Sequence, residues 1–332
     1  MARRKIAVIG LGLALTPHAK SLVDLSDRVE VAAGFSYEDR HRKAWTETYG
    51  FPATDDLDDI FADKSIDTVI VLTPATTHYD VVKRAALSGK NVLVEKPLEV
   101  TYARAKELVD ICRQAGVTFG VCLQHRYRPS GRKLAGMIAA GELGRIVCAS
   151  AHARMWRPQT YYDEPGRGTL ARDGGGVLLT QAIHTLDIML YLCGPFESVN
   201  SFVTTTPIHR METEDLVCGS IKFVNGAIGV VEATTAAYPG YPETVEIIAE
   251  KGCATVAGTA LSVRFHDGRT FDIASDATSG GAGANPMDFP HDYHRDLITD
   301  FLDAIEEKRD PNVSGAKALE VIRLIDALLG KS

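Results

Sequence analysis

The chain is poor in cysteine and has no excess of positive charge. Its 332 residues include six cysteines, and none of these form a Cys-x-x-Cys pair, so no zinc knuckle or redox motif is indicated. The formal net charge is −7, whereas nucleic-acid binders usually carry a basic face. No apolar run approaches the ~20 residues that cross a bilayer. We therefore expect no metal, no nucleic-acid partner and no membrane span, and the dispersed thiols fit a reducing cytoplasm.

The N-terminus resembles a secretory leader, because Arg3, Arg4 and Lys5 precede an apolar run that reaches Leu15. Cleavage there would delete the first predicted strand and the glycine turn that follows it. We therefore expect these residues to begin the first domain instead of serving as a leader.

The first 123 residues alternate strand and helix patterns with short connections, which is typical of a parallel sheet with crossover helices. The predicted strands cover residues 5–10, 29–35, 67–72, 91–95 and 117–123. The predicted helices cover residues 17–26, 38–49, 76–88 and 101–115, with a short extra helix at 55–61. The 45% hydrophobic content suffices for a second core beyond this region.

Residues 124–332 follow a different pattern. A helix near 130–140, a strand at 145–155 and a helical stretch over 177–192 precede several alternating strands between 198 and 271. Among these strands, Asn225-Gly226 is a strong hairpin signal. A loop rich in small residues is predicted over 275–290, and two helices close the chain near 292–307 and 316–329.

The predicted fold class is therefore α/β. A doubly wound parallel sheet of the Rossmann type spans residues 1–123, and an α+β domain with a large open, mainly antiparallel sheet spans 124–332, whose last helices can pack back on the first domain. Because few helices are predicted to cover the open sheet, one of its faces needs a partner. We expect that partner to be another copy of the chain, which gives a homodimer or a homotetramer.

Two strand ends in the first domain point to a bound dinucleotide. Gly10-Leu11-Gly12 follows a strand and precedes a helix, although the third glycine of the fingerprint is replaced by Leu15. The strand 91–95 ends in Glu95 and is followed directly by Lys96 and a proline. Ligands of open parallel sheets bind at the carboxyl ends of the strands, so Lys96 brings a cation to that crevice.

The end of the second predicted strand bears on which nicotinamide cofactor is used. Ser36 stands where an acidic residue would bind the ribose hydroxyls and repel a 2′-phosphate. Arg40 and Arg42 follow and could meet such a phosphate, whereas Glu38 and Asp39 would oppose it. The sequence leaves NAD and NADP open, with a slight preference for NADP.

These motifs resemble the glucose-fructose oxidoreductase, inositol dehydrogenase and rhizopine-catabolism (Gfo/Idh/MocA) family of oxidoreductases. The resemblance rests on the glycine turn, on residues 73–78 (Thr-Pro-Ala-Thr-Thr-His), on residues 95–97 (Glu-Lys-Pro), on residues 174–176 (three glycines) and on residues 184–187 (His-Thr-Leu-Asp). It implies a Rossmann domain, a second domain whose open sheet mediates oligomerisation, and a cis peptide bond between Lys96 and Pro97.

The resemblance also implies particular site residues. Those expected to contact the cofactor are Gly10, Leu11, Gly12, Leu13, Ala14, Ser36, Thr73, Pro74, His78, Glu95, Lys96 and Arg126. His184 matches the family's catalytic histidine, whose ordinary pKa suits proton transfer in both directions. Lys96 would stabilise developing negative charge on the substrate oxygen while the cofactor takes the hydride.

The chain departs from the commonest family pattern one helical turn before His184. Many relatives have an aspartate there, whereas this chain has Thr180 followed by Gln181. A threonine holds no charge, and the change is similar to that in relatives acting on nucleotide-linked sugars. Asp187 is expected to orient structure or a subunit contact more than to supply the missing acid. What replaces the aspartate stays open.

The loop that follows the strand at 145–155 supplies aromatic planes and cations. We take Tyr162 and Arg167 as substrate candidates, together with Thr180, Gln181 and Asp187, because aromatic rings stack on sugars and arginine binds carboxylate or phosphate through two hydrogen bonds. Self-packing of the loop is the alternative. Arg126 is expected to face the substrate or the carboxamide of the cofactor.

The sequence thus predicts an NAD(P)-dependent oxidoreductase that transfers hydride between a nicotinamide and a secondary alcohol or ketone. Its substrate would be a sugar, sugar acid, nucleotide-sugar or cyclitol. A nicotinamide-dependent glycosidase of the same family, or a non-catalytic dinucleotide-binding regulator, stays as an alternative. The sequence names neither the substrate, its reacting carbon nor the direction of the reaction.

Overall fold

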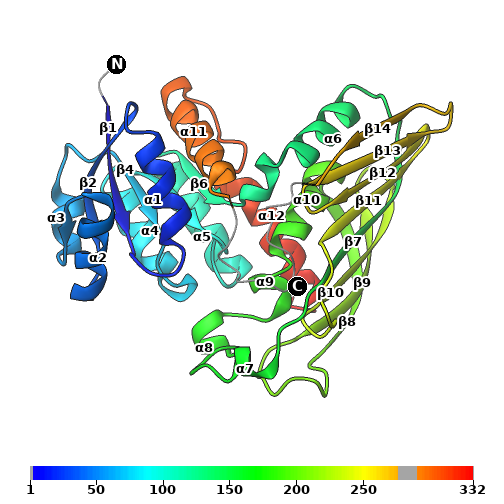
Figure 1. The fold of residues 1–332 in the computed structure, drawn as a ribbon, viewed down its shortest axis with the longest axis horizontal. Helices are drawn as coiled ribbons and strands as arrows, with labels where there is room; N and C mark the ends of the chain where they lie inside the picture. The colour runs from blue at the N-terminus through cyan, green and yellow to red at the C-terminus, as the bar shows by residue number, and fades with distance from the viewer. Residues whose placement is uncertain (1–2, 276–289, 332) are drawn as a thin grey trace. The chain divides into compact units, whose positions relative to one another are not determined.

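The chain folds into two compact units in the computed structural model, which describes residues 3–275 and 290–331 (Figure 1). The first unit contains residues 1–123 and 291–319, and the second contains residues 124–290 and 320–332. The chain therefore leaves the first unit after Leu123 and returns to it at His291. The predicted loop over 275–290 lies almost entirely outside the described residues.

The first unit is built on a six-stranded parallel sheet, in the order β3-β2-β1-β4-β5-β6. This is the strand order of a doubly wound dinucleotide-binding sheet, so the predicted fold of this region is confirmed. Its strands are β1 (Arg4–Ile9), β2 (Val29–Phe35), β3 (Ala53–Thr54), β4 (Thr68–Val71), β5 (Asn91–Glu95) and β6 (Phe119–Cys122). The two-residue β3 was not predicted, because two residues offer no periodicity.

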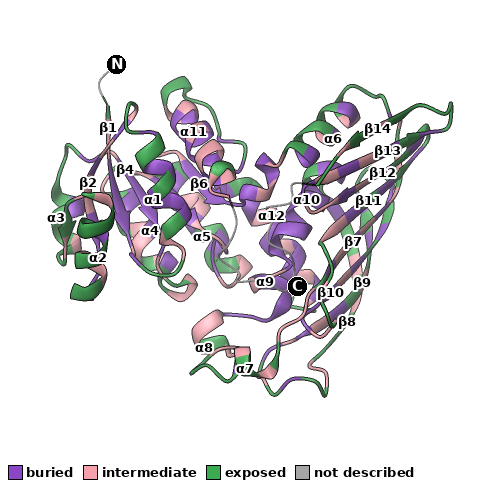
Figure 2. Ribbon diagram, in the orientation of Figure 1, coloured by how far each residue is buried: buried purple, intermediate pink, exposed green. Residues whose placement is uncertain are grey.

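Helices connect these strands as the sequence predicts. They are α1 (Leu15–Asp24), α2 (Asp39–Tyr49), α3 (Leu57–Ala62), the 3₁₀ turn η1 (Ala75–Thr77), α4 (His78–Leu87) and α5 (Tyr102–Gln114). The returning segment adds α11 (Asp292–Glu307) and the beginning of α12 (Gly315–Leu328). Helix α1 packs on α11, and α4 packs on α5. The residues of β4 are all buried, as in Figure 2, because helices cover the sheet.

The second unit contains an eight-stranded sheet in the order β14-β13-β12-β11-β7-β10-β9-β8. Its strands are β7 (Ile146–Arg154), β8 (Phe196–Thr204), β9 (Leu216–Phe223), β10 (Ile228–Thr234), β11 (Thr244–Ala249), β12 (Gly252–Ala257), β13 (Ala260–Phe265) and β14 (Thr270–Ile273). All neighbours pair antiparallel except β7 and β10, so the sheet is mixed at its centre. Asn225-Gly226 makes the predicted hairpin between β9 and β10, with Gly226 at φ +89°.

The helical elements of the second unit that precede β8 are the 3₁₀ turn η2 (Gln124–Tyr127), α6 (Pro129–Ala139), α7 (Gln159–Tyr162), α8 (Leu170–Asp173), α9 (Val177–Thr180) and α10 (Ile183–Cys193). Of these, α6, α9 and α10 pack on the sheet. The single helix predicted over 177–192 is thus two helices, broken after Thr180. Helix α10 packs on β7, where Ala149, Ala151 and Ala153 are buried.

Buried and exposed residues alternate along β9, β10 and β11, as Figure 2 shows. The exposed positions include Ile228, Val230 and Ile248, so this face of the sheet is partly apolar. Of the described helices, none alone has the length and apolar character to cross a membrane; the segments 170–180 and 183–193 reach that threshold only when joined across a 44° bend.

Candidate active site

The turn after β1 has the geometry of a dinucleotide-binding loop. Gly10 has φ +103°, and a Cβ there would lie 2.8 Å from the backbone of Leu72, so only glycine fits. Among the described residues, nothing lies within 4 Å of a Cβ built at Gly12, so the chain leaves open space beside this backbone. Helix α1 then begins at Leu15 without an acidic residue in its first turn. This N-terminus can receive a diphosphate, so the residues fit the implied cofactor.

The other residues of the turn lie at its surface or beneath it. Leu11 is buried, Leu13 is exposed and Ala14 is the N-cap of α1. At the end of β2, the buried Ser36 accepts a hydrogen bond from the Glu38 amide at 3.2 Å. Its hydroxyl therefore shapes the following turn.

The two arginines beside Ser36 have local partners. The Arg40 guanidinium lies 2.6 Å from a Glu38 carboxylate oxygen. Arg42 donates to the carbonyl oxygens of Ser36 and Tyr37 and lies 3.4 Å from the carboxylates of Asp39 and Asp55. A 2′-phosphate would have to compete with these carboxylates for both cations.

His78 connects the loop after β4 to the turn after β5. The buried imidazole has Nε2 2.9 Å from the Thr73 carbonyl oxygen and Nδ1 2.9 Å from the Pro97 carbonyl oxygen. Burial lowers the pKa of His78, and its hydrogen bonds with the two carbonyls act in the opposite direction. The Lys96–Pro97 peptide bond is cis, as the resemblance implied. His78 thus joins the two loops through its hydrogen bonds. Pro74 is the N-cap of η1.

Glu95 is anchored inside the first unit. Its Oε1 lies 2.7 Å from Nε2 of His18 on α1, and its Oε2 accepts the backbone N–H of Lys96 at 2.9 Å. Burial acts to raise the pKa of Glu95, but the hydrogen bond with His18 and nearby positive charge hold the pKa at about 2. The ionised carboxylate therefore fixes the backbone from which Lys96 projects.

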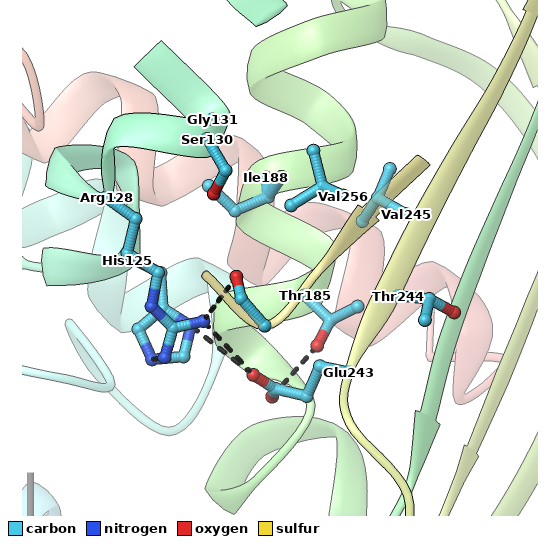
Figure 3. Close-up of a pocket in the computed structure, with 11 residues that line it drawn as sticks. His125, Arg128, Ser130, Gly131, Thr185, Ile188, Glu243, Thr244, Val245 and Val256 are labelled. Atoms are coloured by element: carbon cyan, nitrogen blue, oxygen red, sulfur yellow. Dashed lines mark hydrogen bonds and ion pairs between the residues drawn. The ribbon is translucent and has the colours of Figure 1, made fainter. Parts of the chain in front are cut away.

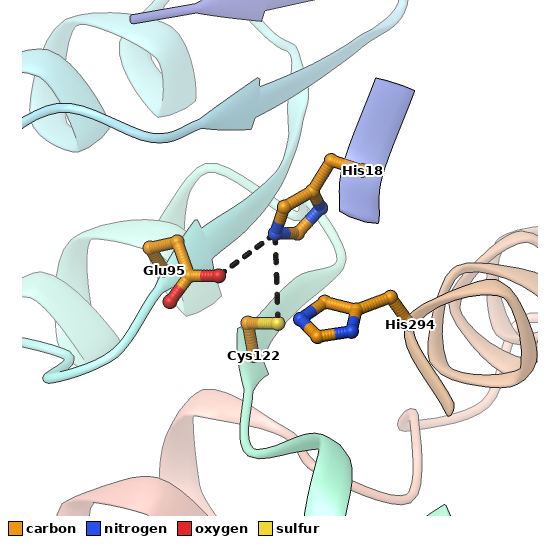
Figure 4. Close-up of side chains that lie close together, drawn as sticks. All are labelled: His18, Glu95, Cys122 and His294. Atoms are coloured by element: carbon orange, nitrogen blue, oxygen red, sulfur yellow. Dashed lines mark hydrogen bonds and ion pairs between the residues drawn. The ribbon is translucent and has the colours of Figure 1, made fainter. Parts of the chain in front are cut away.

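His18 and Glu95 belong to a cluster with Cys122 and His294, shown in Figure 4, whose ligand atoms lie within 4.8 Å of one another. These residue types can bind zinc, yet tetrahedral ligands stand about 3.3 Å apart, whereas the His18–Glu95 pair is at 2.7 Å. Burial keeps the pKa of the Cys122 thiol well above its ordinary value and lowers the pKa of His294 to about 3. The geometry favours a hydrogen-bonded network with a neutral thiol.

In the second unit, the glycine triplet lets its backbone lie close to that of Glu214, and this contact positions α9. A Cβ at Gly176 would lie 2.1 Å from the Glu214 carbonyl oxygen. The Glu214 carboxylate meanwhile accepts the N–H groups of Gly176 and Leu178 at 3.2 and 3.3 Å, which caps the helix. The position of α9 fixes the break before α10, the helix that carries His184.

At that break, the Thr180 hydroxyl donates to the Gly176 carbonyl oxygen at 2.7 Å and also contacts the Gln181 side chain. Thr180 is therefore engaged with its own helix.

His184 lies in the first turn of α10, and its ring stacks on His125 from η2. The two ring centroids are 4.1 Å apart with an angle of 25° between the planes, and His184 is 8% exposed. Arg128 donates to Nε2 of His125 at 2.7 Å. An arginine only donates, so this nitrogen carries no proton and His125 is neutral with its proton on Nδ1. Nδ1 lies 3.4 Å from Glu243 Oε2.

Arg126 and Asp187 form a buried pair beside these histidines. The guanidinium donates through Nε at 2.8 Å and through Nη2 at 2.6 Å to the two carboxylate oxygens. The charge of Asp187 offsets the cost of burying the guanidinium and raises the Arg126 pKa. The pair joins η2 to α10.

The loop candidates Tyr162 and Arg167 also have partners within the second unit. Tyr162 is buried, its hydroxyl is 2.8 Å from Thr235 Oγ1, and burial raises its pKa to about 12. A substrate role for Tyr162 therefore has no support in this arrangement. Arg167 donates to Glu164 and to the Tyr161 hydroxyl, and its guanidinium stacks on the Tyr161 ring. These contacts match the self-packing alternative.

A small cavity adjoins the stacked histidines and is lined by His125, Arg128, Thr185 and Glu243, among others (Figure 3). This cavity has room for a water molecule. The Thr185 hydroxyl donates to Glu243 Oε1 at 3.0 Å, and Arg128 lies 3.8 Å from Glu243 Oε2. These polar groups share the cavity wall with apolar residues such as Ile188, Val245 and Val256.

The sequence motifs gave no role to His125 or Arg128, which stand on either side of Arg126 in sequence. Sequence reasoning missed His18, Cys122, His294, Thr185 and Glu243. Glu243 lies 58 residues from Thr185 and no motif surrounds it, so only the fold brings it to this place. His294 stands among Asp292, Arg295 and Asp296, so its sequence neighbours give no sign that the ring is buried.

Comparison with known proteins identifies the family. Residues 4–123 match the model of an oxidoreductase family with an NAD-binding Rossmann fold, and residues 132–255 match the Gfo/Idh/MocA C-terminal domain. The chain is an oxidoreductase by fold and sequence, and it belongs to the Gfo/Idh/MocA family, which confirms the resemblance.

Individual relatives are more distant. The chain is 28% identical to scyllo-inositol 2-dehydrogenase (NAD(+)) of Bacillus subtilis over 82% of this chain and 80% of the other. A structure of levoglucosan dehydrogenase in complex with NADH and levoglucosan has a TM-score of 0.89 at 23% identity, covering 99% and 97% of the two chains. The WlbA dehydrogenase of Bordetella pertussis, in complex with NADH and UDP-GlcNAcA, has a TM-score of 0.83 at 25% identity, covering 99% and 96%.

Proposed function

We propose that the chain is a nicotinamide-dependent dehydrogenase that acts at a secondary alcohol of a sugar, sugar acid, nucleotide-sugar or cyclitol. The observation that carries the proposal is an intact dinucleotide turn, with open space beside Gly12, in the same sheet as a lysine at the carboxyl end of β5. The relatives named above, which act on a cyclitol and bind sugars with NADH, support the substrate class.

The proposed roles follow from the residues. When bound, the nicotinamide accepts or supplies the hydride, and the protein orients the substrate and moves a proton. Lys96, whose backbone is fixed by Glu95, stabilises charge on the substrate oxygen. His184, at the start of α10, takes or returns the hydroxyl proton. Lys96 lies in the first unit and His184 in the second, and that they meet around one substrate stays a prediction.

The proposed cofactor is NAD. Ser36 gives no charge that would exclude a 2′-phosphate, which is why the sequence slightly favoured NADP. Arg40 and Arg42, the cations on which that preference rested, lie beside the carboxylates of Glu38, Asp39 and Asp55. These acids weaken attraction for a phosphate. Steady-state kinetics with both cofactors decide the point, and a higher kcat/KM with NADP would reverse it.

The remaining predicted contacts stand as proposals of the same kind. Around the cofactor they are Gly10, Leu11, Leu13, Ala14, Thr73, Pro74, His78 and Glu95, and toward the substrate they are Arg167, Thr180 and Gln181. For Arg126 and Asp187 we propose an orienting role, because their buried pair fixes η2 against α10.

We also propose that two copies stack through the face of the second sheet that carries Ile228, Val230 and Ile248. The register places Cys148 opposite both isoleucines, so the apolar positions are contiguous. Light scattering at micromolar concentration tests this, and a monomeric mass would remove it. The six cysteines, all without a disulfide, support a reducing cytoplasm as the compartment.

The experiment for the activity follows absorbance at 340 nm with NAD and with NADP across sugars, sugar acids, inositols and nucleotide-sugars. Net reduction of cofactor by at least one of these alcohols is the expected result. Cleavage of a glycoside without net reduction would replace this proposal with the glycosidase. Tight cofactor binding with no turnover of any kind would favour the regulator.

A further inference from the structure

Glu243 lies in the second unit and contacts two residues that are neighbours of His184, namely Thr185 and His125. Its Oε1 accepts the hydroxyl of Thr185, the residue next to His184, at 3.0 Å. Its Oε2 lies 3.4 Å from Nδ1 of His125, the ring that stacks on His184. The carboxylate is thus tied both to the backbone neighbour and to the stacking partner of the proposed proton-transfer residue.

The protonation of His125 follows from these contacts. Arg128 donates to Nε2, so the remaining proton is on Nδ1 and points toward Glu243. Without the carboxylate, the imidazole loses the acceptor that selects this orientation. A neutral ring held flat against His184 leaves room for a proton on His184, whereas a cationic ring at 4.1 Å would oppose it.

The charges beside the histidine pair also point to Glu243. Arg128 lies 3.8 Å from Glu243 Oε2, so the carboxylate offsets a fixed positive charge beside the histidine pair. Thr180, one turn before His184, carries no charge and is engaged with Gly176.

The other elements packed on α10 bring few competing charges toward it. Helix α9 and the buried positions of β7 present apolar side chains, and on α6 the cations of Arg132 and Lys133 lie over the rings of Tyr127 and Phe271. The charged or titratable groups nearest His184 from η2, its following residue, α10 and the start of β11 are therefore His125, Arg126, Arg128, Asp187 and Glu243. Arg126 and Asp187 neutralise each other.

We propose that Glu243 is a positioning residue for proton transfer, acting through His125 and Thr185 to hold His184 oriented and able to accept a proton. The inference rests on the proposed function of His184. It assigns to Glu243, far away in sequence, the supporting carboxylate that Thr180 cannot provide.

The test uses the full-length chain with Glu243→Gln, which keeps an acceptor for Thr185 but removes the charge. Glu246→Gln on the exposed side of β11 is the matched control. Titration of ¹³C-labelled histidines by NMR, with the His184 signal assigned from His184→Gln, measures the pKa of the ring directly. We expect the His184 pKa to fall by about one unit in Glu243→Gln and to stay unchanged in the control.

Kinetics supply the second measurement. In Glu243→Gln we expect kcat to fall about tenfold or more with little change in KM, and the pH profile of kcat to shift in the same direction as the NMR titration. Thr185→Val, which removes one of the two links, should give a smaller fall, and it serves in place of Glu243→Gln should that variant not fold.

Different results would overturn the role of Glu243 and the proposed dehydrogenase activity. An unchanged His184 titration together with an unchanged pH profile in an active Glu243→Gln enzyme would overturn the role of Glu243 and leave the dehydrogenase intact. Absence of turnover in the unmodified chain would overturn the proposed function, while the NMR titration would still decide whether Glu243 controls the protonation of His184.

Discussion

Each unit contains a pair of histidine rings in contact beside a glutamate, but the two pairs are arranged differently. In the first unit, the rings of His18 and His294 meet edge to face, with centroids 5.0 Å apart and planes at 77°. In the second, His125 and His184 stack at 4.1 Å and 25°, and Arg128 donates to one of them. Similar residue types thus form an internal brace in one unit and a charged, polar surrounding for the proposed proton-transfer residue in the other.

The difference lies in what surrounds the rings. The first cluster includes the thiol of Cys122, which is buried together with both histidines, while Glu95 is partly buried. His294 has a pKa of about 3 there, mainly because of burial. The second adjoins a cavity large enough for water and contains a glutamate and an arginine. In the first unit burial lowers the pKa of His294 although the ionised Glu95 acts in the opposite direction, whereas in the second unit a glutamate and an arginine lie beside the rings.

Substitution of one histidine in each unit should give the largest difference between an effect on catalysis and an effect on stability. His184→Asn is expected to reduce kcat by about 10²–10⁴-fold with thermal stability nearly unchanged, because a proton-transfer group is lost. His294→Asn is expected to lower stability by about 1–3 kcal/mol and kcat by less than about tenfold. Steady-state kinetics and urea unfolding of both variants check this. Comparable kinetic losses in the two would contradict the division.

Lys96 tests whether the brace in the first unit serves chemistry. Lys96→Ala should lower kcat by about 10²–10³-fold through loss of charge stabilisation, since Glu95 holds the backbone by contacts that do not need the lysine side chain. The fold, followed by circular dichroism, should persist. Near-normal turnover would show that the cluster around Glu95 is structural only.

The buried pair in the second unit should contribute mainly to stability. Arg126→Met leaves the Asp187 carboxylate without its two donors, and we expect a loss of about 3–5 kcal/mol in unfolding free energy. The double variant Arg126→Met with Asp187→Leu should recover part of that loss because no buried charge is left unpaired. Equal stability of the single and double variants would disprove the coupling.

Low pH should lower the folding stability of the chain through protonation of Glu95 in the first cluster. Its folded pKa of about 2 lies below the ordinary 4.5, so its contribution is present above pH 4.5 and is lost as the pH falls through about 2. The lowering of the Glu95 pKa corresponds to about 3 kcal/mol of folding stability. Solvent screening reduces this contribution little, because the side chain is largely buried. Urea midpoints of Glu95→Gln and the unmodified chain should therefore converge between pH 7 and pH 3. A gap independent of pH would contradict this account.

Sequence reasoning was most successful where a motif is local. The turn at Gly10, the cis bond before Pro97 and the hairpin at Asn225-Gly226 each depend on neighbouring residues, and the structure contains all three. The parallel sheet of the first unit was predicted from the alternation of strand and helix patterns, and the structure contains it.

The contacts that sequence reasoning could not supply are long-range. His294 reaches His18 only because residues 291–319 return to the first unit, and Glu243 reaches Thr185 only because β11 lies near α10. Tyr162 appeared suited to stacking on a sugar, but its burial depends on Thr235, another distant residue. Composition gives the kind of side chain, while the direction in which it points is set by tertiary packing.

The return of α11 to the first unit has a consequence for synthesis on the ribosome. The face of α1 that packs on α11, including Ser21 beneath His291, must wait until the sheet of the second unit has been translated. At about 5–20 residues per second, that interval is on the order of ten seconds or more. Throughout that interval α1 of the nascent first unit lacks the helix that covers it in the folded chain.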